Sequence, residues 1–507
     1  MVSPFSRALP ARVDLEQQKS QAKELLRAFA AADPTARERV RAVLPDKPTI
    51  VLADAQFVLA REYGFESWSA LRRHIDDRIA AARAPHEQMH SAMQRGDAPV
   101  VRQLFTQHPE FRPMINAPLF AYNAPAIVAC ADSAAMVEVL LEFGADPNRR
   151  SEWWAGRFHA LHVATGETAE RLIAAGATPD ACAAAHLDKP ELLQSLLLKN
   201  PACASERGGD GQTPLHFARS TRVVDMLLDA GADINARDVD HRATPAEWML
   251  DRSRDAGRYV LASYLVERGA SADIFLASAL GRTNEVVAML QRDPTLLDAQ
   301  TGRGHYAEKP PSSFHIYFWT IGRDRSPLDV AAQFGHEATL AAMLPLASPV
   351  QRLRLACRRA DTEGAHALAR EYPTLVNQFR ALDRRALTDA AWDADAPSVA
   401  LMMSLGFDPA VPGQDMGTAL HCAAWRGSPA CVTAILRYDS GRALIAQTDA
   451  HHGQTPLGWC CHGSLHGPHT GDFVSVVRLL LEHGAAPCED TASDAVEEVL
   501  ATWPRTT

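Results

Sequence analysis

Residues 210–235 read Asp-Gly-Gln-Thr-Pro-Leu-His-Phe-Ala-Arg-Ser-Thr-Arg-Val-Val-Asp-Met-Leu-Leu-Asp-Ala-Gly-Ala-Asp-Ile-Asn, and this stretch decides the fold. Thr213 and Pro214 predict the start of a helix, because threonine can cap a first turn and proline gives up no hydrogen bond there. Apolar residues recur at three- and four-residue spacing across 223–228, which predicts a second helix. Gly231 is its expected end, since glycine adopts the left-handed cap conformation at little cost.

The stretch resembles an ankyrin repeat. The Thr-Pro-Leu-His-x-Ala sequence from Thr213 and the Gly-Ala-Asp-x-Asn sequence from Gly231 are both typical of that family. One such unit cannot bury its faces alone, so related units are expected on both sides of it. Similar starts recur at an average spacing of about 33 residues, which is the period of the family. These starts are Glu87, Ala124, His159, Pro179, Thr213, Thr244, Ala272, Ser326, Gln351, Arg385, Thr418 and Thr455.

Agreement with the signature varies along the chain. Ser326, Thr418 and Thr455 open good matches, whereas four other units keep only a helix of small residues followed by an apolar helix. The resemblance predicts about twelve repeats. Residues 301–325 form an insertion ahead of Ser326 that is longer than an ordinary interrepeat loop.

The predicted fold is an all-α solenoid of helix-turn-helix repeats with short hairpin loops, preceded by a small helical unit. The expected parts are a flexible leader at 1–12, the helical unit at 13–83, the repeat array at 85–490, and a capping helix and tail at 491–507. The unit at 13–83 has two interpretations: a cap over the apolar face of the first repeat, or a separate docking module. Asp494, Glu497 and Glu498 are expected to face solvent, because a terminal repeat needs a polar outer face.

Composition limits the partners and the compartment. The chain has 507 residues and a net charge of −10, without a long run of Lys or Arg, so nucleic acid is not an expected partner. No apolar run approaches the roughly 20 residues that span a bilayer, and the first residues lack the order of a secretion signal. Nine cysteines are expected as reduced, packed thiols of a cytoplasmic protein. The excess of arginine over lysine suggests a bacterial source.

Histidines recur at the fourth position of the repeat signature, at His162, His216 and His421. The resemblance implies a structural role for them, with hydrogen bonds to backbone within and between repeats. No motif for a nucleophilic serine, a phosphate-binding glycine loop or a metalloprotease helix is present. We therefore expect no enzyme activity, no catalytic residue and no cofactor.

The last repeat is rich in potential zinc ligands, namely His451, His452, Cys460, Cys461, His462, His466 and His469. Two cysteines and two histidines could hold zinc, which would make a metal-dependent sensor or enzyme. The other interpretation is a solvated histidine-rich insertion between two helices. Cys460 and Cys461 occupy small-residue positions where at least one should face the core, which favours the second interpretation.

Aromatic residues gather in the loops before the repeat signatures, which in the ankyrin family project as fingers along the concave edge. The candidate partner-binding residues are Phe120, Tyr122, Trp153, Trp154, Phe158, Phe314, Tyr317, Phe318 and Trp319. Aromatic side chains are favoured anchors of protein interfaces. The alternative is that individual rings pack on neighbouring fingers or fill gaps beside a short repeat.

These features predict a monomeric, non-catalytic scaffold that binds an unidentified protein or peptide on the concave face of the array. The N-terminal unit at 13–83 or the histidine-rich last repeat could instead serve a sensor or an enzyme. A bacterial effector aimed at a host protein is a third hypothesis, and it differs from the first in location rather than in chemistry.

Overall fold

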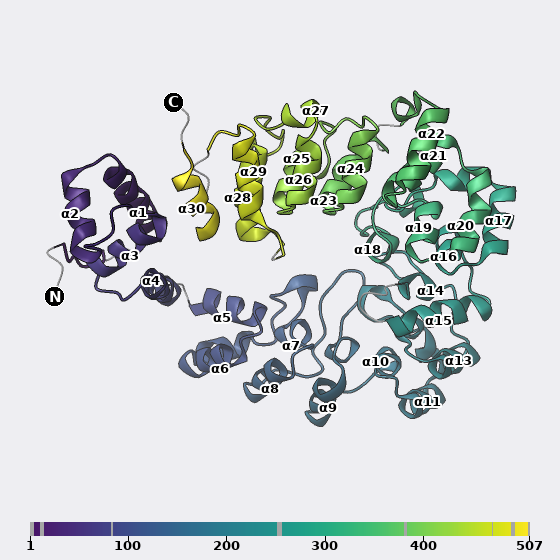
Figure 1. Cartoon of the computed structure of the whole chain (residues 1–507). Helices are drawn as coiled ribbons and strands as arrows, with labels where there is room; N and C mark the ends of the chain where they lie inside the picture. The colour runs from purple at the N-terminus through teal and green to yellow at the C-terminus, as the bar shows by residue number, and fades with distance from the viewer. Residues whose placement is uncertain are drawn as a thin grey trace. The chain divides into compact units, whose positions relative to one another are not determined.

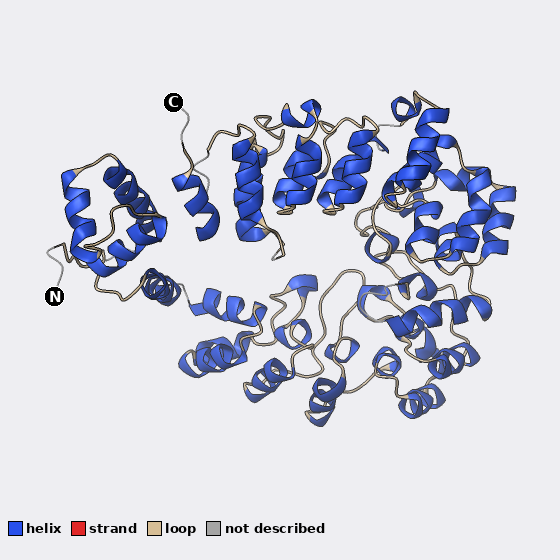
Figure 2. Ribbon diagram, viewed as in Figure 1, coloured by secondary structure: helices blue, strands red, loops and turns tan. Residues whose placement is uncertain are grey.

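The computed structural model describes residues 5–10, 15–82, 85–250, 256–379, 383–468, 470–487 and 492–504. Helices and connecting loops make up these residues, and the only strand pairing among them is two isolated bridges, Phe120 with Ala124 and Lys309 with Ser312 (Figure 2). The chain divides into two compact units. Unit 1 joins residues 1–82 with 348–507, and unit 2 comprises residues 83–347. The all-α fold is therefore confirmed.

Four helices open unit 1, and they enclose a small core of their own. They are α1 (Leu15–Ala30), α2 (Pro34–Val43), α3 (Leu52–Glu62) and α4 (Trp68–Ala82). Leu25, Leu59 and Ile75 are buried together in this core. The Arg39 guanidinium donates to both oxygens of the buried Glu62 carboxylate at 2.8 Å, which ties α2 to the end of α3.

Unit 2 is built from successive helix pairs, and in most of them the first helix is shorter than the second. Its repeat helices are α5 (Pro85–Gln94), α6 (Ala98–Gln107), α7 (Ala126–Ala129), α8 (Ala134–Glu142), η3 (Ala160–His162), α9 (Gly166–Ala174), α10 (Ala181–His186), α11 (Pro190–Lys199), α12 (Pro214–Phe217), α13 (Thr221–Asp229), α14 (Pro245–Trp248), α15 (Ala256–Glu267), α16 (Ile274–Ala279), α17 (Thr283–Arg292), α19 (Pro327–Gln333) and α20 (Glu337–Met343).

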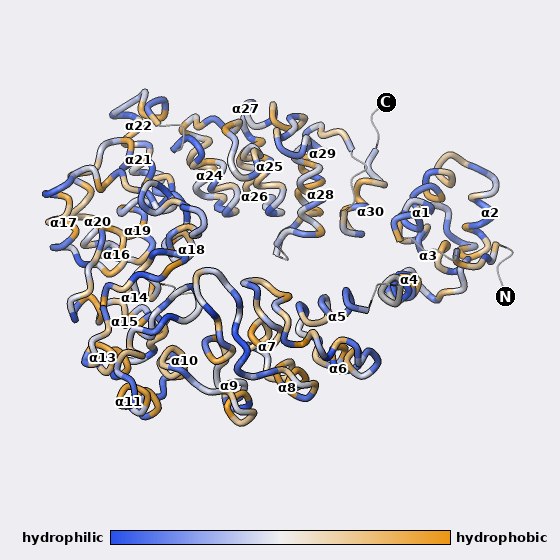
Figure 3. The backbone as a smooth tube through the Cα atoms, turned by 180° about the vertical axis from the view of Figure 1, so that it is seen from behind, coloured by the Kyte–Doolittle hydropathy of each residue, from blue (hydrophilic) through white to orange (hydrophobic). Residues whose placement is uncertain are grey.

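The same pairing continues through the second part of unit 1. Its helices are α21 (Pro349–Arg358), α22 (Thr362–Glu371), α23 (Ala386–Trp392), α24 (Ala396–Ser404), α25 (Ala419–Trp425), α26 (Pro429–Leu436), α27 (Asp439–Arg442), α28 (Pro456–His466), α29 (Phe473–Glu482) and α30 (Asp494–Thr502). The first helices α23, α25 and α28 lie side by side, and each contacts the next (Figure 1). Apolar residues recur along second helices such as α8 (Figure 3). In α8 the buried residues are Met136, Val137, Val139 and Leu140.

The stretch that predicted the fold forms α12 and α13 as expected. His216 contributes to the cap of α12, because its Nδ1 accepts a hydrogen bond from the Thr213 amide at 3.0 Å. The other ring nitrogen, Nε2, donates to the Ala243 carbonyl at 3.1 Å and so reaches the next repeat. Gly231 ends α13 with φ +88°, the left-handed conformation that glycine adopts most readily.

The C-terminal helix α30 differs from its predicted exposure. Glu497 is buried, with 1% of its surface exposed, and does not face solvent. Its side chain accepts the Ala492 amide at 3.3 Å and lies 3.7 Å from the Lys23 ammonium of α1. Arg72 of α4 also donates to Asp494 at 3.2 Å. Part of the polar face of α30 therefore contacts the N-terminal helices, and the prediction of a solvent-facing Glu497 is wrong.

No helix in the described ranges combines the length and the apolar character that crossing a membrane requires.

Candidate functional site

Four of the predicted finger aromatics meet in one cluster, which we call the finger cluster: Tyr122, Trp153, Trp154 and Phe158. The Tyr122 ring lies 5.3 Å from the rings of both Trp153 and Phe158, and Trp153 lies 5.8 Å from Trp154. Tyr122 is 52% exposed and Trp154 is 45% exposed, whereas Trp153 and Phe158 are partly buried beneath them. The cluster is thus an aromatic surface in which two exposed rings contact two partly buried ones.

Phe120 precedes this cluster and behaves differently. Its ring stacks on His90 at 5.1 Å, and it packs partly buried against the apolar core of the first repeats. Tyr122 is held in the left-handed region at φ +61°, an uncommon conformation for a residue with a side chain. The sharp local turn separates the two rings, so that Phe120 points to the core and Tyr122 to solvent.

The insertion at 301–325 is anchored by hydroxyl groups around one carboxylate. Tyr317, on α18 (Tyr317–Thr320), donates to Asp273 Oδ1 at 2.9 Å, and Tyr306 donates to Asp273 Oδ2 at 2.8 Å. Burial raises the pKa of the Asp273 carboxyl and carries the pKa of the Tyr317 hydroxyl well above its usual value. The insertion therefore packs onto the start of α16 through a buried polar contact.

This anchor removes Tyr317 from the predicted binding surface. Its side chain is fully buried at 0% exposure, so it cannot contact a partner in this conformation, and that prediction is wrong. The other three rings that were predicted to bind a partner, Phe314, Phe318 and Trp319, are not fully buried. Phe314 stacks on Phe318 at 4.5 Å, Arg323 lies over both rings, and Trp319 is 62% exposed.

The repeat histidines hold neighbouring repeats together. His421 Nε2 donates to the Gln454 carbonyl at 3.0 Å, as His216 does to Ala243. His162 makes the equivalent bridge to a side chain, because its Nε2 lies 3.0 Å from both oxygens of Asp180. Burial lowers the pKa of His216 to about 4, so that ring is neutral near pH 7.

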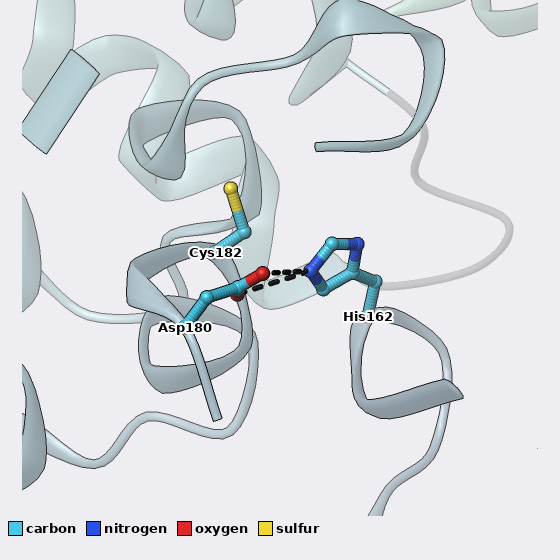
Figure 4. A group of neighbouring side chains, drawn as sticks. All are labelled: His162, Asp180 and Cys182. Carbon is cyan, nitrogen blue, oxygen red and sulfur yellow. Dashed lines mark hydrogen bonds and ion pairs between the residues drawn. The ribbon is translucent and has the colours of Figure 1, made fainter. Parts of the chain in front are cut away.

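His162, Asp180 and Cys182 converge closely enough to be weighed as a metal centre (Figure 4). Asp180 is already the cap of α10, accepting the Ala183 amide at 2.8 Å, and it also takes a hydrogen bond from Arg150 at 2.7 Å. His162 Nδ1 accepts the His159 amide at 3.3 Å. Burial raises the pKa of the Cys182 thiol, which disfavours the thiolate that a metal needs. These contacts make the group part of the scaffold.

Among the described residues, the potential zinc ligands of the last repeat do not meet at one point. Cys460 and Cys461 are both fully buried, and the Cys460 thiol lies 3.6 Å from the Phe473 carbonyl oxygen. His462 and His466 lie on α28 rather than in a loop, because the helix continues to residue 466. Their rings are exposed and 4.6 Å apart, whereas both thiols are buried. His469 lies outside the described residues.

Sequence reasoning missed a second aromatic site, in unit 1. Trp392, Trp425 and Trp459 line a cavity of about 710 Å³ together with Asp415, His452 and His462. The sequence does contain a pattern that points to this cavity: a ring-bearing residue recurs at one position of three successive repeats. Trp392 and Trp425 end the first helices of two of them, and His462 has the same position in the third. That position lies outside the repeat signature, so the signature alone did not draw attention to it.

The ankyrin repeat family model matches residues 210–239 and 452–492. The first match covers α12 and α13, and the second covers α28 and α29. A comparison with curated proteins finds no match for the chain.

Proposed function

This chain is an ankyrin-repeat protein, and on that premise we propose that it is a non-catalytic scaffold that binds a protein or peptide on its finger-bearing, concave face. Ankyrin repeats generally mediate protein–protein interaction, and the family is typically non-enzymatic. The partner surface on this chain is the finger cluster, extended by the exposed Trp319.

The observation that supports this proposal is the exposure of the Tyr122 and Trp154 rings within one cluster. A patch of exposed aromatic rings is unfavourable in water, and such patches commonly mark interaction sites. The two rings rest on Trp153 and Phe158, so their orientation is set before a partner arrives. A preorganised anchor loses less conformational entropy on binding, which strengthens the complex.

A paired-variant experiment tests the proposal. Tyr122→Ser with Trp154→Ser removes both open rings, while Leu198→Ser removes an apolar side chain that is 79% exposed on α11, outside the fingers. Tagged parent and variants are used for affinity capture from extracts of the source cell, with quantitative mass spectrometry. We expect partners that the parent and Leu198→Ser retain to be lost from the double variant, at an unchanged melting temperature. Equal recovery by all three proteins would exclude the finger cluster.

A further inference from the structure

The cavity in unit 1 is walled by tryptophan rings from three successive repeats. Trp392 and Trp425 end α23 and α25, and Trp459 lies within α28. The Trp392 and Trp425 rings are nearly parallel, with 4° between their planes and 6.5 Å between centroids. Trp459 stands at 77° to Trp425, with 6.3 Å between centroids. The cavity volume of about 710 Å³ is within the range of small-ligand pockets.

The Trp459 ring is fixed in place before any ligand binds. Its Nε1–H donates to the buried Asp449 carboxylate at 2.9 Å. Burial alone would raise the pKa of Asp449, but the hydrogen bonds from His452, Trp459 and neighbouring amides outweigh it and hold the pKa at about 2. Gly417 packs against the ring edge so closely that a Cβ there would come within 2.6 Å of it. The Trp459 ring is therefore held in one orientation, and the Asp449 carboxylate that accepts its hydrogen bond stays ionised.

The charges at this cavity favour a cation. Asp415 contributes a carboxylate to the lining, and no Lys or Arg is among the described residues that form the walls. Desolvation lowers the pKa of His462, with smaller contributions from the nearby His466 and His452, so that His462 is neutral near pH 7. The three tryptophan rings also line this cavity, and the face of an aromatic ring carries the negative side of its quadrupole.

We propose that the cavity formed by Trp392, Trp425, Trp459 and Asp415 binds a quaternary ammonium group. A cation over the face of tryptophan is attracted by the ring, and quaternary ammonium groups are the ligands for which aromatic cages are built. Such a group has no N–H donor and can present methyl groups to the three tryptophan rings, whereas a primary ammonium depends on the acceptors of the lining, among them Asp415. This site goes beyond the proposed function and is separate from the finger cluster, so each can fail without the other.

The same group occurs in two chemical settings, a trimethylated lysine within a protein segment and a small solute such as choline. The full-length protein is titrated with choline, with a short peptide carrying trimethyllysine and with the same peptide carrying unmodified lysine, using calorimetry. The neutral carbon isostere of choline, in which carbon replaces nitrogen, is the matched control for shape. We expect the ammonium ligands to bind on the order of tenfold or more tightly than the isostere or the unmodified peptide.

Two variants locate the binding in the cavity. Asp415→Asn changes an exposed residue, and Trp425→Leu removes the central ring; each should weaken binding of the ammonium ligands severalfold or more. Trp154→Leu in the finger cluster should leave their binding unchanged. Tighter binding of the peptide than of choline assigns the site to a protein segment, and equal binding assigns it to a small solute. Failure of both ligands to bind, equal binding of the isostere, or normal binding by Asp415→Asn and by a folded Trp425→Leu would overturn the proposal.

Discussion

Asp210 is a buried residue whose surroundings disfavour its charge. Burial raises the pKa of its carboxyl to about 7, and the nearby Asp240 and Asp238 add to the effect while His241 opposes it. A carboxyl whose folded pKa lies above its unfolded value of about 3.9 binds its proton more tightly in the folded state. The stabilisation that this bound proton gives to the folded state is fully present below about pH 4 and is lost as pH rises towards 7.

Asp210→Asn should therefore stabilise the protein at pH 8 and have little effect near pH 4. Asparagine tolerates the left-handed backbone at this position, where φ is +54°. Melting temperatures of parent and variant across pH 4–8 measure the difference. Asp229→Asn, at an exposed position of α13, is the matched control for the loss of one carboxylate. A parallel pH profile for parent and Asp210→Asn would show that the carboxyl is ionised without cost.

Leu227 and Leu228 offer a matched pair in the stretch that decides the fold. Leu227 is fully buried, whereas Leu228 is only partly buried. Leu227→Ala should cost about 2–5 kcal/mol, because the repeat cannot fully collapse around the missing side chain. Leu228→Ala should cost clearly less. Denaturant titration followed by circular dichroism measures both; equal losses would mean that the two faces of α13 are buried alike.

The sequence predicted the histidines of the repeat signature and missed the tryptophan cavity of unit 1, whose tryptophans lie at positions that the signature does not fix. His216 and His421 were expected to bridge repeats because the signature fixes their position. Trp459 and Asp415 come from different positions of the repeat, and only the stacking of α25 on α28 brings them to one cavity. Convergence of this kind depends on how repeats pack, which single-repeat patterns do not encode.

At the scale of elements, proline, serine and glycine marked helix ends well, because capping is a local property. The insertion at 301–325 was harder, since the burial of Tyr317 depends on Asp273, which lies 44 residues earlier. Its aromatic composition alone could not separate the anchoring ring from the exposed one.

Tyr317→Ser and Trp319→Ser should therefore have opposite consequences. Tyr317→Ser removes a fully buried ring and its hydrogen bond to Asp273, and should cost about 3–5 kcal/mol. Trp319→Ser changes a ring that is 62% exposed, and should change stability by about 0.5 kcal/mol or less. Thermal melts of both variants provide the comparison. A large loss for Trp319→Ser would place its ring in the core and remove it from the proposed partner surface.

The period of the repeats predicted an array, but not that it falls into two units. The division lies between Ala347 and Ser348, after the short pair α19 and α20. Repeat spacing indicates where helices start, whereas a division depends on which helices contact one another. Each unit has an apolar core cluster of its own, with members such as Leu140 in unit 2 and Leu480 in unit 1.

Separate cores should give separate unfolding, because repeats are stabilised mainly by their nearest neighbours. Leu140→Ala on α8 and Leu480→Ala on α29 each create a cavity at a fully buried position. Hydrogen exchange measured by mass spectrometry should then show faster exchange across the helices near the substitution, while peptides of the other unit keep the parent rate. Faster exchange throughout both units after either substitution would mean that the whole array unfolds as one cooperative body. In that case a substitution in one unit would lower the free energy of unfolding of both units. The stability of the finger cluster in unit 2 would then depend on the repeats of unit 1, and that of the tryptophan cavity on the repeats of unit 2.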